Sequence, residues 1–255
     1  MPQSQPNLVR FFATVLLLGQ VLLRLCQGKF NYRLTVEQMN ISGPGSLVPV
    51  LLVTGCAGMI FTVQTARELA RFGAVNAVGG AFALAFCREL APILTASIVA
   101  GQVGSAFAAE IGAMQVTEQI EALYMLRTDP INYLVLPRVV ACCLMLPILT
   151  IIALVTGITG GILAAAQFYQ LAPNVFLHSV QDFLTPTDLV SILLKGGIFG
   201  VLVGIIGCSW GLTTYGGVRE VGQSATAAVV NTWIGIFLMD FFLSLILFGK
   251  PVTGY

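Results

Sequence analysis

The sequence predicts an all-α, polytopic membrane protein. Of its 255 residues, 57% are hydrophobic and only 9% are charged, whereas about 25% of an ordinary soluble domain is charged. The mean hydropathy is +0.91. The apolar residues form long continuous runs, unlike the short alternating segments of a membrane β-barrel. We therefore expect an interfacial N-terminal helix, about five transmembrane helices and one cytoplasmic helix between two of them.

The composition also argues against several kinds of site. The formal net charge is +1, so nothing indicates a nucleic-acid partner. The six cysteines form no CxxC pair and mostly lie in apolar runs, as small buried hydrophobic residues do. The single histidine excludes a His-rich metal site. Because no GxxxxGK(S/T), GxSxG or HExxH motif occurs, we expect no catalytic residue, metal or cofactor in this chain.

Residues 1–46 are interpreted as an interfacial helix and a connector. Residues 8–27 are apolar except along one helical face, which carries Arg10, Ala13, Thr14, Gln20, Arg24 and Gln27. A helix with this pattern lies in the membrane interface rather than across the membrane. A signal peptide is disfavoured, because basic residues recur along the segment and no A-x-A-like cleavage site follows. Residues 42–45 read SGPG, which predicts a loop before the first crossing.

Residues 47–255 are interpreted as the transmembrane domain. The apolar run from 74 to 113 is too long for one straight crossing. We therefore expect a partly inserted lead-in at 74–87 and then a full crossing, kinked at Pro92. Loops are predicted at 167–188 and 211–224. The five expected crossings are residues 47–65, 90–109, 139–166 (with Pro147), 189–210 (with Lys195) and 225–248 (with Asp240).

A short helix is predicted within residues 114–130, which are polar enough to leave the membrane. Thr117 is its expected N-cap, and Asp129-Pro130 is its expected stop. An acidic start precedes an apolar stripe of Ile120, Leu123, Tyr124 and Met125. Such a helix is either a connector between two spans or a docking site for a cytoplasmic partner, and the residues alone leave both open.

Five crossings place the two ends of the chain on opposite sides of the membrane. The N-terminal side then carries seven basic residues and the other side carries four, so the positive-inside rule predicts a cytoplasmic N-terminus. The seven are Arg10, Arg24, Lys29, Arg33, Arg127, Arg138 and Arg219; the four are Arg67, Arg71, Arg88 and Lys250.

Small residues recur at four-residue spacing in two of the crossings. Such columns let membrane helices approach closely, within one subunit or between two. One crossing carries Ala96, Ala100, Gly104, Ala108 and Gly112, flanked by Ser97, Gly101, Ser105, Ala109 and Ala113. Another carries Gly196, Gly200 and Gly204. These columns predict a tightly packed bundle and leave open whether a second subunit takes part.

Charged residues inside apolar segments are the remaining candidates for function. Arg88 and Glu89 either border a polar pathway or cap two helices at the membrane surface. Glu110 is expected at the interface, and Lys195 is expected to extend its ammonium group to a surface. Asp240 requires an internal partner, a water-filled cavity or an interface.

Several long runs between residues 87 and 138 are specific enough to indicate a family. They read RELAP at 88–92, AGQVGS at 100–105, AAEIG at 108–112, VTEQIEAL at 116–123, DP at 129–130 and LPR at 136–138. Together they resemble the core of the MlaE/YrbE permease family, and the resemblance covers nearly the whole chain. Gln102 departs from the pattern, because many members carry arginine there, which weakens any role assigned to a cation at this position.

The resemblance implies the permease subunit of an ATP-driven (ABC) transporter that moves phospholipid between membranes. A second copy of the chain would enclose a central lipid cavity. A separate ATPase subunit would carry ATP and Mg²⁺, and an MCE-domain lipid-binding protein would sit on the opposite membrane face. The coupling helix to the ATPase would contain Thr117, Glu118, Gln119 and Glu121. The lipid cavity or its mouth would be lined by Arg88, Glu89 and Pro92.

The resemblance also implies a location. The chain lacks a long N-terminal extension of the plant plastid type, so we expect a bacterial, cyanobacterial or plastid-encoded member. The membrane would be the inner (plasma) membrane of a bacterium or cyanobacterium, or the chloroplast inner envelope, with a cytoplasmic or stromal N-terminus.

Two alternatives come from the residues themselves. An ion-coupled secondary transporter would use the carboxylates of Glu89, Glu110 and Asp240, although no inverted repeat is evident. A membrane-embedded enzyme is the weakest alternative, because no catalytic set is present.

Overall fold

The computed structural model describes residues 7–26 and 32–249. Within these ranges every regular element is helical and no strand occurs, which confirms the predicted all-α class. Five helical runs in the described chain are long and apolar enough to cross a membrane, as the sequence predicts. These runs are Tyr32–Arg71, Val75–Val116, Ile131–Tyr169, Pro186–Leu212 and Val218–Phe248. The predicted basic residues Lys29 and Lys250 lie outside the described ranges.

The chain divides into two compact units, which are described separately. Unit 1 comprises residues 1–46, 96–146 and 197–238, and unit 2 comprises residues 47–95, 147–196 and 239–255. Four long helices contribute residues to both units: α2 (Tyr32–Arg71), α7 (Leu136–Tyr169), α9 (Pro186–Leu212) and α10 (Val218–Phe248).

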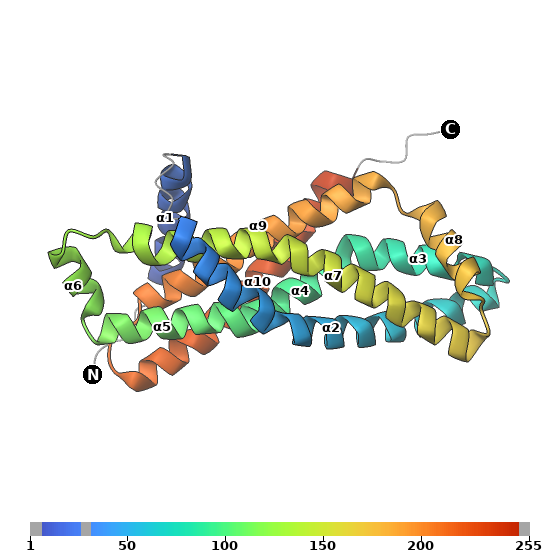
Figure 1. Cartoon of the computed structure of the whole chain (residues 1–255), viewed down its shortest axis with the longest axis horizontal. Coiled ribbons are helices and arrows are strands. Elements are labelled where there is room, and N and C mark those ends of the chain that lie inside the picture. The colour runs from blue at the N-terminus through green and yellow to red at the C-terminus, as the bar shows by residue number, and fades with distance from the viewer. Residues whose placement is uncertain (1–6, 27–31, 250–255) are drawn as a thin grey trace. The chain divides into compact units, whose positions relative to one another are not determined.

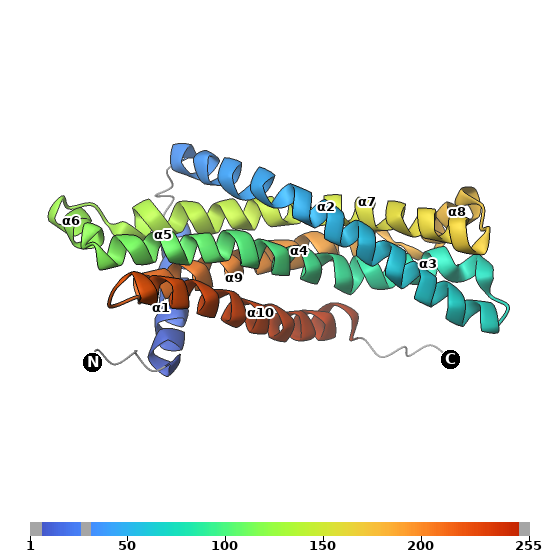
Figure 2. The same ribbon diagram turned by 90° about the horizontal axis from the view of Figure 1, so that it is seen from below.

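Unit 1 contains the N-terminal helix α1 (Asn7–Cys26), α5 (Ser105–Val116), α6 (Gln119–Met125) and the π-helical turn η4 (Ile131–Val135). Helix α1 lies across the direction of the long helices' portions in unit 1 (Figures 1 and 2). Its side chains Leu17 and Val21 are buried, whereas most of its other large apolar side chains are exposed. This exposed apolar side is what a helix in the membrane interface requires. A small buried cluster of Ala108, Ile206, Trp210 and Ala228 joins α5, α9 and α10.

Unit 2 is built around α3 (Val78–Ala85) and α8 (Pro173–Phe183). The Phe82 ring packs on those of Phe86 and Phe176, with centroid distances of 5.2 and 6.3 Å. The Gly80 amide donates a 2.8 Å hydrogen bond to Ser179 Oγ. A Cβ atom on Gly80 would lie 2.6 Å from the Ser179 carbonyl oxygen, so only glycine permits this approach of α3 to α8.

The predicted loop at 42–45 is wrong, because these residues lie inside α2. Gly43 packs directly on Met145 of α7, and a Cβ atom there would collide with the Met145 side chain. Within a membrane, a broken helix leaves backbone groups without water, whereas glycine and proline are tolerated when neighbouring helices support them. The predicted boundary between residues 46 and 47 therefore falls within a continuous helix.

The predicted lead-in at 74–87 and the predicted crossing at 90–109 lie in one helical run, with no break between them. Residues 75–116 form one helical run that is interrupted only by two π-helical turns. After the short 3₁₀ turn η1 (Val75–Ala77) and α3 come the π turn η2 (Phe86–Leu90), α4 (Ala91–Val99), the π turn η3 (Ala100–Gly104) and α5. Turns of this type are frequent at functional sites, and η2 carries the charged pair of Arg88 and Glu89.

Two predicted loops are shorter in the structure. Residues 167–188 contain α8, which begins with Pro173 and buries Phe176, Ser179 and Val180 on one side. Proline favours the first turn of a helix, so this start signal was present in the sequence. In the second loop, only residues 213–217 lie between α9 and α10, because α10 begins at Val218.

Candidate functional site

Lys195 of α9 is the centre of a polar cluster in unit 2. The predicted extension of its side chain to a surface is wrong, because the side chain is fully buried. Its ammonium group donates hydrogen bonds of 2.8 Å to the Arg88 carbonyl, to Glu89 Oε2 and to Ser244 Oγ. It also forms a 2.8 Å ion pair with Asp240 of α10. Asp240 therefore has the internal partner that its position in an apolar span requires.

The Arg88 carbonyl is available to Lys195 because of Pro92. In an α-helix, the amide of residue 92 would donate to the carbonyl of residue 88, but proline has no amide hydrogen. Because the buried Pro92 cannot donate, the Arg88 carbonyl lacks this donor within its helix. The Lys195 ammonium group donates to it instead. Pro92, predicted near a lipid cavity, thus acts on the polar cluster through the backbone.

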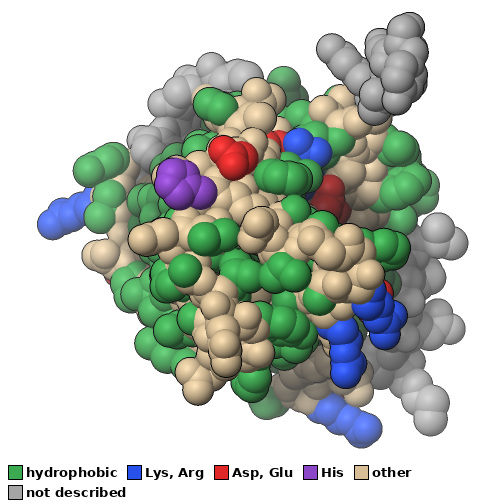
Figure 3. Space-filling model, turned by 90° about the vertical axis from the view of Figure 1, so that its right-hand side faces the viewer, with side chains coloured by type: hydrophobic (Ala, Val, Ile, Leu, Met, Phe, Trp, Pro, Cys, Tyr) green, Lys and Arg blue, Asp and Glu red, His purple; other side chains and the backbone are tan. Residues whose placement is uncertain are grey.

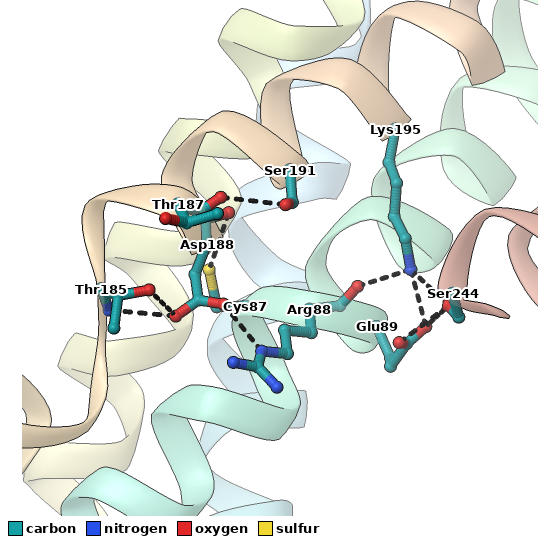
Figure 4. A network of polar contacts seen from close by, with 9 residues as sticks. All are labelled: Cys87, Arg88, Glu89, Thr185, Thr187, Asp188, Ser191, Lys195 and Ser244. Carbon is teal, nitrogen blue, oxygen red and sulfur yellow. Dashed lines mark hydrogen bonds and ion pairs between the residues drawn. The ribbon is translucent and has the colours of Figure 1, made fainter. Parts of the chain in front are cut away.

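Arg88 faces a second carboxylate, on the first turn of α9. Its Nε atom donates a 2.7 Å hydrogen bond to Asp188 Oδ1. Asp188 Oδ2 accepts hydrogen bonds from the Thr185 amide and hydroxyl, at 3.0 and 2.8 Å. The guanidinium group also lies 4.4 Å from the Phe248 ring centroid. Figure 4 shows Arg88 pointing towards Asp188, whereas Glu89 and Lys195 point towards Ser244 of α10.

The Lys195 cluster is defined here as Arg88, Glu89, Asp188, Lys195, Asp240 and Ser244. It brings two cations and three carboxyl groups together from η2, α9 and α10. Lys195, Asp188 and Asp240 are buried, whereas the side chains of Arg88 and Glu89 remain 32% and 38% exposed. Arg88 and Glu89 are therefore the members that can meet a ligand, and the buried members hold them in place.

A separate ion pair occupies unit 1. Glu110 of α5 accepts a 2.7 Å hydrogen bond from Arg138 Nη2, and the Arg138 guanidinium lies 5.3 Å from the Phe107 ring centroid. The Glu110 side chain is 55% exposed, whereas the Arg138 side chain is 8% exposed. The pair links α5 to the start of α7, on either side of α6.

Helix α6 is a short exposed helix between two left-handed residues. Glu118 has φ = 59° and Arg127 has φ = 55°, values that non-glycine residues rarely adopt. The predicted N-cap role of Thr117 is wrong, because its hydroxyl donates a 2.8 Å hydrogen bond back to the Ala113 carbonyl of α5. The backbone places Glu118 at the N-cap position, without a side-chain cap.

Asp129 begins the next helical segment rather than stopping α6, which ends at Met125. Its Oδ1 atom accepts a 3.0 Å hydrogen bond from the Ile131 amide, at the first residue of η4. This side chain satisfies an amide at a helical start, as an N-cap residue does. The stop of α6 itself comes from the left-handed residue Arg127.

The outer surface of α6 combines acidic and apolar side chains. Glu118, Gln119 and Glu121 are exposed, and only Ile120 of this helix is buried. Tyr124, Met125 and Leu126 are exposed by 61, 87 and 74%. An apolar group of this kind at the tip of a helix outside the spans marks an interaction surface.

The predicted small-residue column on α4, η3 and α5 is buried against α9 and α10. Ala96, Ala100, Gly104, Ala108 and Gly112 are all buried. On α9, a Cβ atom on Gly200 would lie 2.7 Å from the Cys142 carbonyl carbon, and one on Gly204 would lie 2.9 Å from Val139 Cα. A Cβ atom on Gly196 would similarly lie 3.0 Å from Pro147 Cα. These glycines therefore bring α9 against the backbone of α7.

Gly101 does not share this packing. It is exposed, and a Cβ atom on it would have no neighbour within 4 Å. The adjacent Gln102 is exposed as well, and its side chain makes no hydrogen bond within the described chain. The predicted close packing at Gly101 therefore has no partner helix among the described residues of this chain. An exposed polar side chain in a span favours a further protein surface over lipid tails.

A shallow pocket of about 410 Å³ lies beside α8 in unit 2. It is lined by residues of η1 and α8, including Asn76, His178, Asp182 and Phe183. Figure 3 shows a face of the molecule on which the histidine, the only one in the chain, is exposed. The pocket is lined by both polar and apolar side chains.

The sequence matches the family model of the MlaE permease over residues 35–246. It is 54% identical over 239 residues to a probable ABC transporter permease protein of Synechocystis sp., covering 94% of this chain and 91% of the relative. It is 45% identical over 235 residues to the chloroplastic protein TRIGALACTOSYLDIACYLGLYCEROL 1 of Arabidopsis thaliana, covering 92% and 67%. It is also 45% identical over 246 residues to a probable ABC transporter permease protein of Pyropia yezoensis, covering 96% and 94%. The chain therefore belongs to the MlaE permease family.

Proposed function

We propose that this chain is the permease subunit of an ABC transporter that moves phospholipid between membranes. The observation that carries the proposal is helix α6, which presents acidic and apolar side chains outside two spans. The relatives described as ABC transporter permeases support an ATPase partner. ATP and Mg²⁺ are assigned to that separate subunit, and this chain supplies the membrane path.

The Lys195 cluster supports a lipid cargo with a charged headgroup. Arg88 and Glu89 offer one cation and one anion side by side, at the partly exposed edge of an otherwise buried cluster. A zwitterionic headgroup, which itself carries one cation and one anion, complements the partly exposed Arg88 and Glu89. The Arabidopsis relative is itself named after a diacylglycerol lipid, which supports a lipid cargo and leaves its headgroup open.

A second copy of the chain is assigned to the face that carries Gly101 and Gln102. Small residues permit close approach of two helices, and the unpaired Gln102 amide would find hydrogen-bonding partners there. The α8 pocket is assigned to an MCE-domain partner on the non-cytoplasmic side. This assignment follows from the positive-inside orientation, which places residues 167–188, without a lysine or arginine, away from the cytoplasm.

The location follows from the same orientation and from the relatives. The proposed membrane is the inner membrane of a bacterium or cyanobacterium, or the chloroplast inner envelope, with the N-terminus and α6 on the cytoplasmic or stromal side. Cyanobacterial and chloroplast relatives favour this group of membranes.

The test is co-purification of the tagged chain with its membrane partners, followed by mass spectrometry of proteins and lipids. We expect a P-loop ATPase and a bound phospholipid. Met125→Asp on α6 should weaken ATPase binding by about tenfold or more, since apolar anchors dominate interfaces. Glu121→Lys should weaken binding to a similar extent of about tenfold, because it reverses an exposed charge on the same helix. Glu68→Lys is the matched control, because Glu68 is an exposed acid in unit 2. Wild-type complexes without an ATPase would contradict the proposal.

An ion-coupled transporter gives the opposite results. The observation that favours this second function is the pairing of Glu89 and Asp240 with one lysine. Its transport would follow a proton gradient in vesicles that contain this chain alone, and ATP would have no effect. ATP-dependent lipid transfer only in the presence of the ATPase rejects it.

A further inference from the structure

Helix α1 contacts the rest of unit 1 at two separate places. Near its start, Thr14 Oγ1 lies 2.8 Å from Ser209 Oγ, and the Arg10 guanidinium lies 4.8 Å from the Trp210 ring centroid. The Arg10 Nη1 atom also donates a 3.5 Å hydrogen bond to Ser224 Oγ. These contacts tie α1 to the residues on either side of the loop 213–217, which joins α9 to α10.

Near its end, α1 reaches the connector that follows α6. Arg24 Nη1 lies 2.6 Å from Asp129 Oδ2 and donates a 3.3 Å hydrogen bond to Asn132 Oδ1. Asp129 comes two residues after Arg127, the left-handed residue that ends α6, and its other oxygen caps η4. One carboxylate therefore fixes the start of η4 and receives the cation of α1.

We propose that Arg24 is a positioning residue that ties α1 to the α6–η4 connector, so that movement of α6 is transmitted to the α9–α10 loop. The inference rests on the proposed function, because it assigns α6 as the helix that the ATPase moves. The left-handed residues Glu118 and Arg127 at the two ends of α6 are the points where this helix can turn relative to its flanking spans.

The exposure of the ion pair makes this role separable from folding. The Arg24 and Asp129 side chains are 23% and 40% exposed, and ion pairs of this kind contribute little to stability. The burial of Leu17 and Val21 holds α1 on unit 1 independently of Arg24. Loss of the Arg24 charge should therefore free the connector without detaching the helix.

The first measurement is the amount of lipid transported per ATP hydrolysed, in vesicles that contain the complete transporter. Arg24→Gln and Asp129→Asn should each lower this ratio by about fivefold, a typical size for coupling between sites. The asparagine keeps an oxygen that can accept from the Ile131 amide, so it removes the charge and retains the cap. The double variant should be no worse than either single variant, because both remove the same interaction.

Two comparisons separate positioning from general damage. Arg24→Lys keeps the cation and should restore most of the ratio. Arg71→Gln removes another arginine from an exposed ion pair, the one with Glu68 in unit 2, and should leave the ratio unchanged. A wild-type ratio for Arg24→Gln, or effects of the two single variants that simply multiply, would overturn the inference.

A second measurement does not depend on transport. In the purified chain alone, Arg24→Gln should increase amide hydrogen exchange in residues 117–131 and leave exchange in α3 and α8 unchanged. Unchanged exchange in residues 117–131 would overturn the inference even when the wild-type transporter works. Failure of the wild-type chain to bind an ATPase would instead overturn the proposed function, and the exchange result would still decide whether Arg24 holds the connector.

Discussion

At the scale of the residue, Lys195 has a buried ammonium group whose surroundings depend on the neighbouring helix. Glu89 and Asp240 neutralise it, Ser244 adds a hydroxyl, and Pro92 exposes the Arg88 carbonyl that completes its hydrogen bonds. Burial of a charge is tolerated only when such partners are in place. The buried Lys195 and Asp240 therefore help to fix the partly exposed Arg88 and Glu89.

The replacement Lys195→Met should destabilise the protein by about 3–5 kcal/mol, because it leaves two carboxylates facing each other without their cation. Thermal unfolding of the detergent-purified protein measures this loss. Adding Asp240→Asn to the same variant should recover part of it, since one of the repelling charges is removed. The control Arg71→Gln should cost no more than about 1 kcal/mol, because that pair is exposed. An unchanged melting temperature for Lys195→Met would contradict this account.

At the scale of the element, the glycines of α9 determine how closely two helices approach. The ideal Cβ position of Gly200 lies 2.7 Å from the Cys142 carbonyl carbon and 2.8 Å from Cys143 Cα, and backbone atoms cannot rotate away. Gly101 is also a glycine within a span, but a Cβ atom on it would have no neighbour within 4 Å. Glycines from columns with the same four-residue spacing therefore have different surroundings: Gly200 faces the α7 backbone, whereas Gly101 faces no atom of the described chain.

Gly200→Ala should therefore destabilise the protein by about 1–3 kcal/mol, because the added methyl group pushes α9 away from α7. Gly101→Ala should cost nothing and can stabilise its helix, since alanine restricts the unfolded chain more than glycine does. Chemical unfolding of the two purified variants in the same detergent compares them directly. A Gly200→Ala variant as stable as Gly101→Ala would contradict this account, because the close approach of α9 to α7 would then carry no cost.

The sequence predicted the spans but not every break between them. Hydrophobic runs gave all five crossings, since any helix in a membrane must satisfy its own backbone groups. The loop predicted from the SGPG segment at 42–45 was wrong, because a contact with Met145, far along the chain, supports the helix there. The prediction that Lys195 extends to a surface was wrong for the same reason. Its partners come from η2 and α10, and no pattern around Lys195 indicates them. The local signals for this site were the charged residues Arg88, Glu89 and Asp240 inside apolar segments, together with Pro92 four residues after Arg88.

At the scale of the whole molecule, the surface that remains without a partner indicates how the chain assembles. Many exposed side chains of the described spans are large and apolar, among them leucine, isoleucine, valine and phenylalanine, which suit lipid tails. The segment around Gly101 and Gln102 differs, because it exposes a small residue beside an unpaired amide. A second copy that covers this segment would satisfy the amide and allow two helices to approach closely.

Gly101→Leu should therefore separate the proposed homodimer without unfolding the chain. The larger side chain meets no atom of its own chain within 4 Å at the Cβ position, so the monomer accommodates it. In the dimer, the same side chain would occupy the space that the opposing helix needs. Native mass spectrometry of the purified protein should show monomers for Gly101→Leu and dimers for the wild type and for Gly101→Ala, and ATP-dependent lipid transfer should disappear with the dimer. If Gly101→Leu remains dimeric and active, the second copy binds elsewhere, and the exposed Gln102 amide needs a different partner.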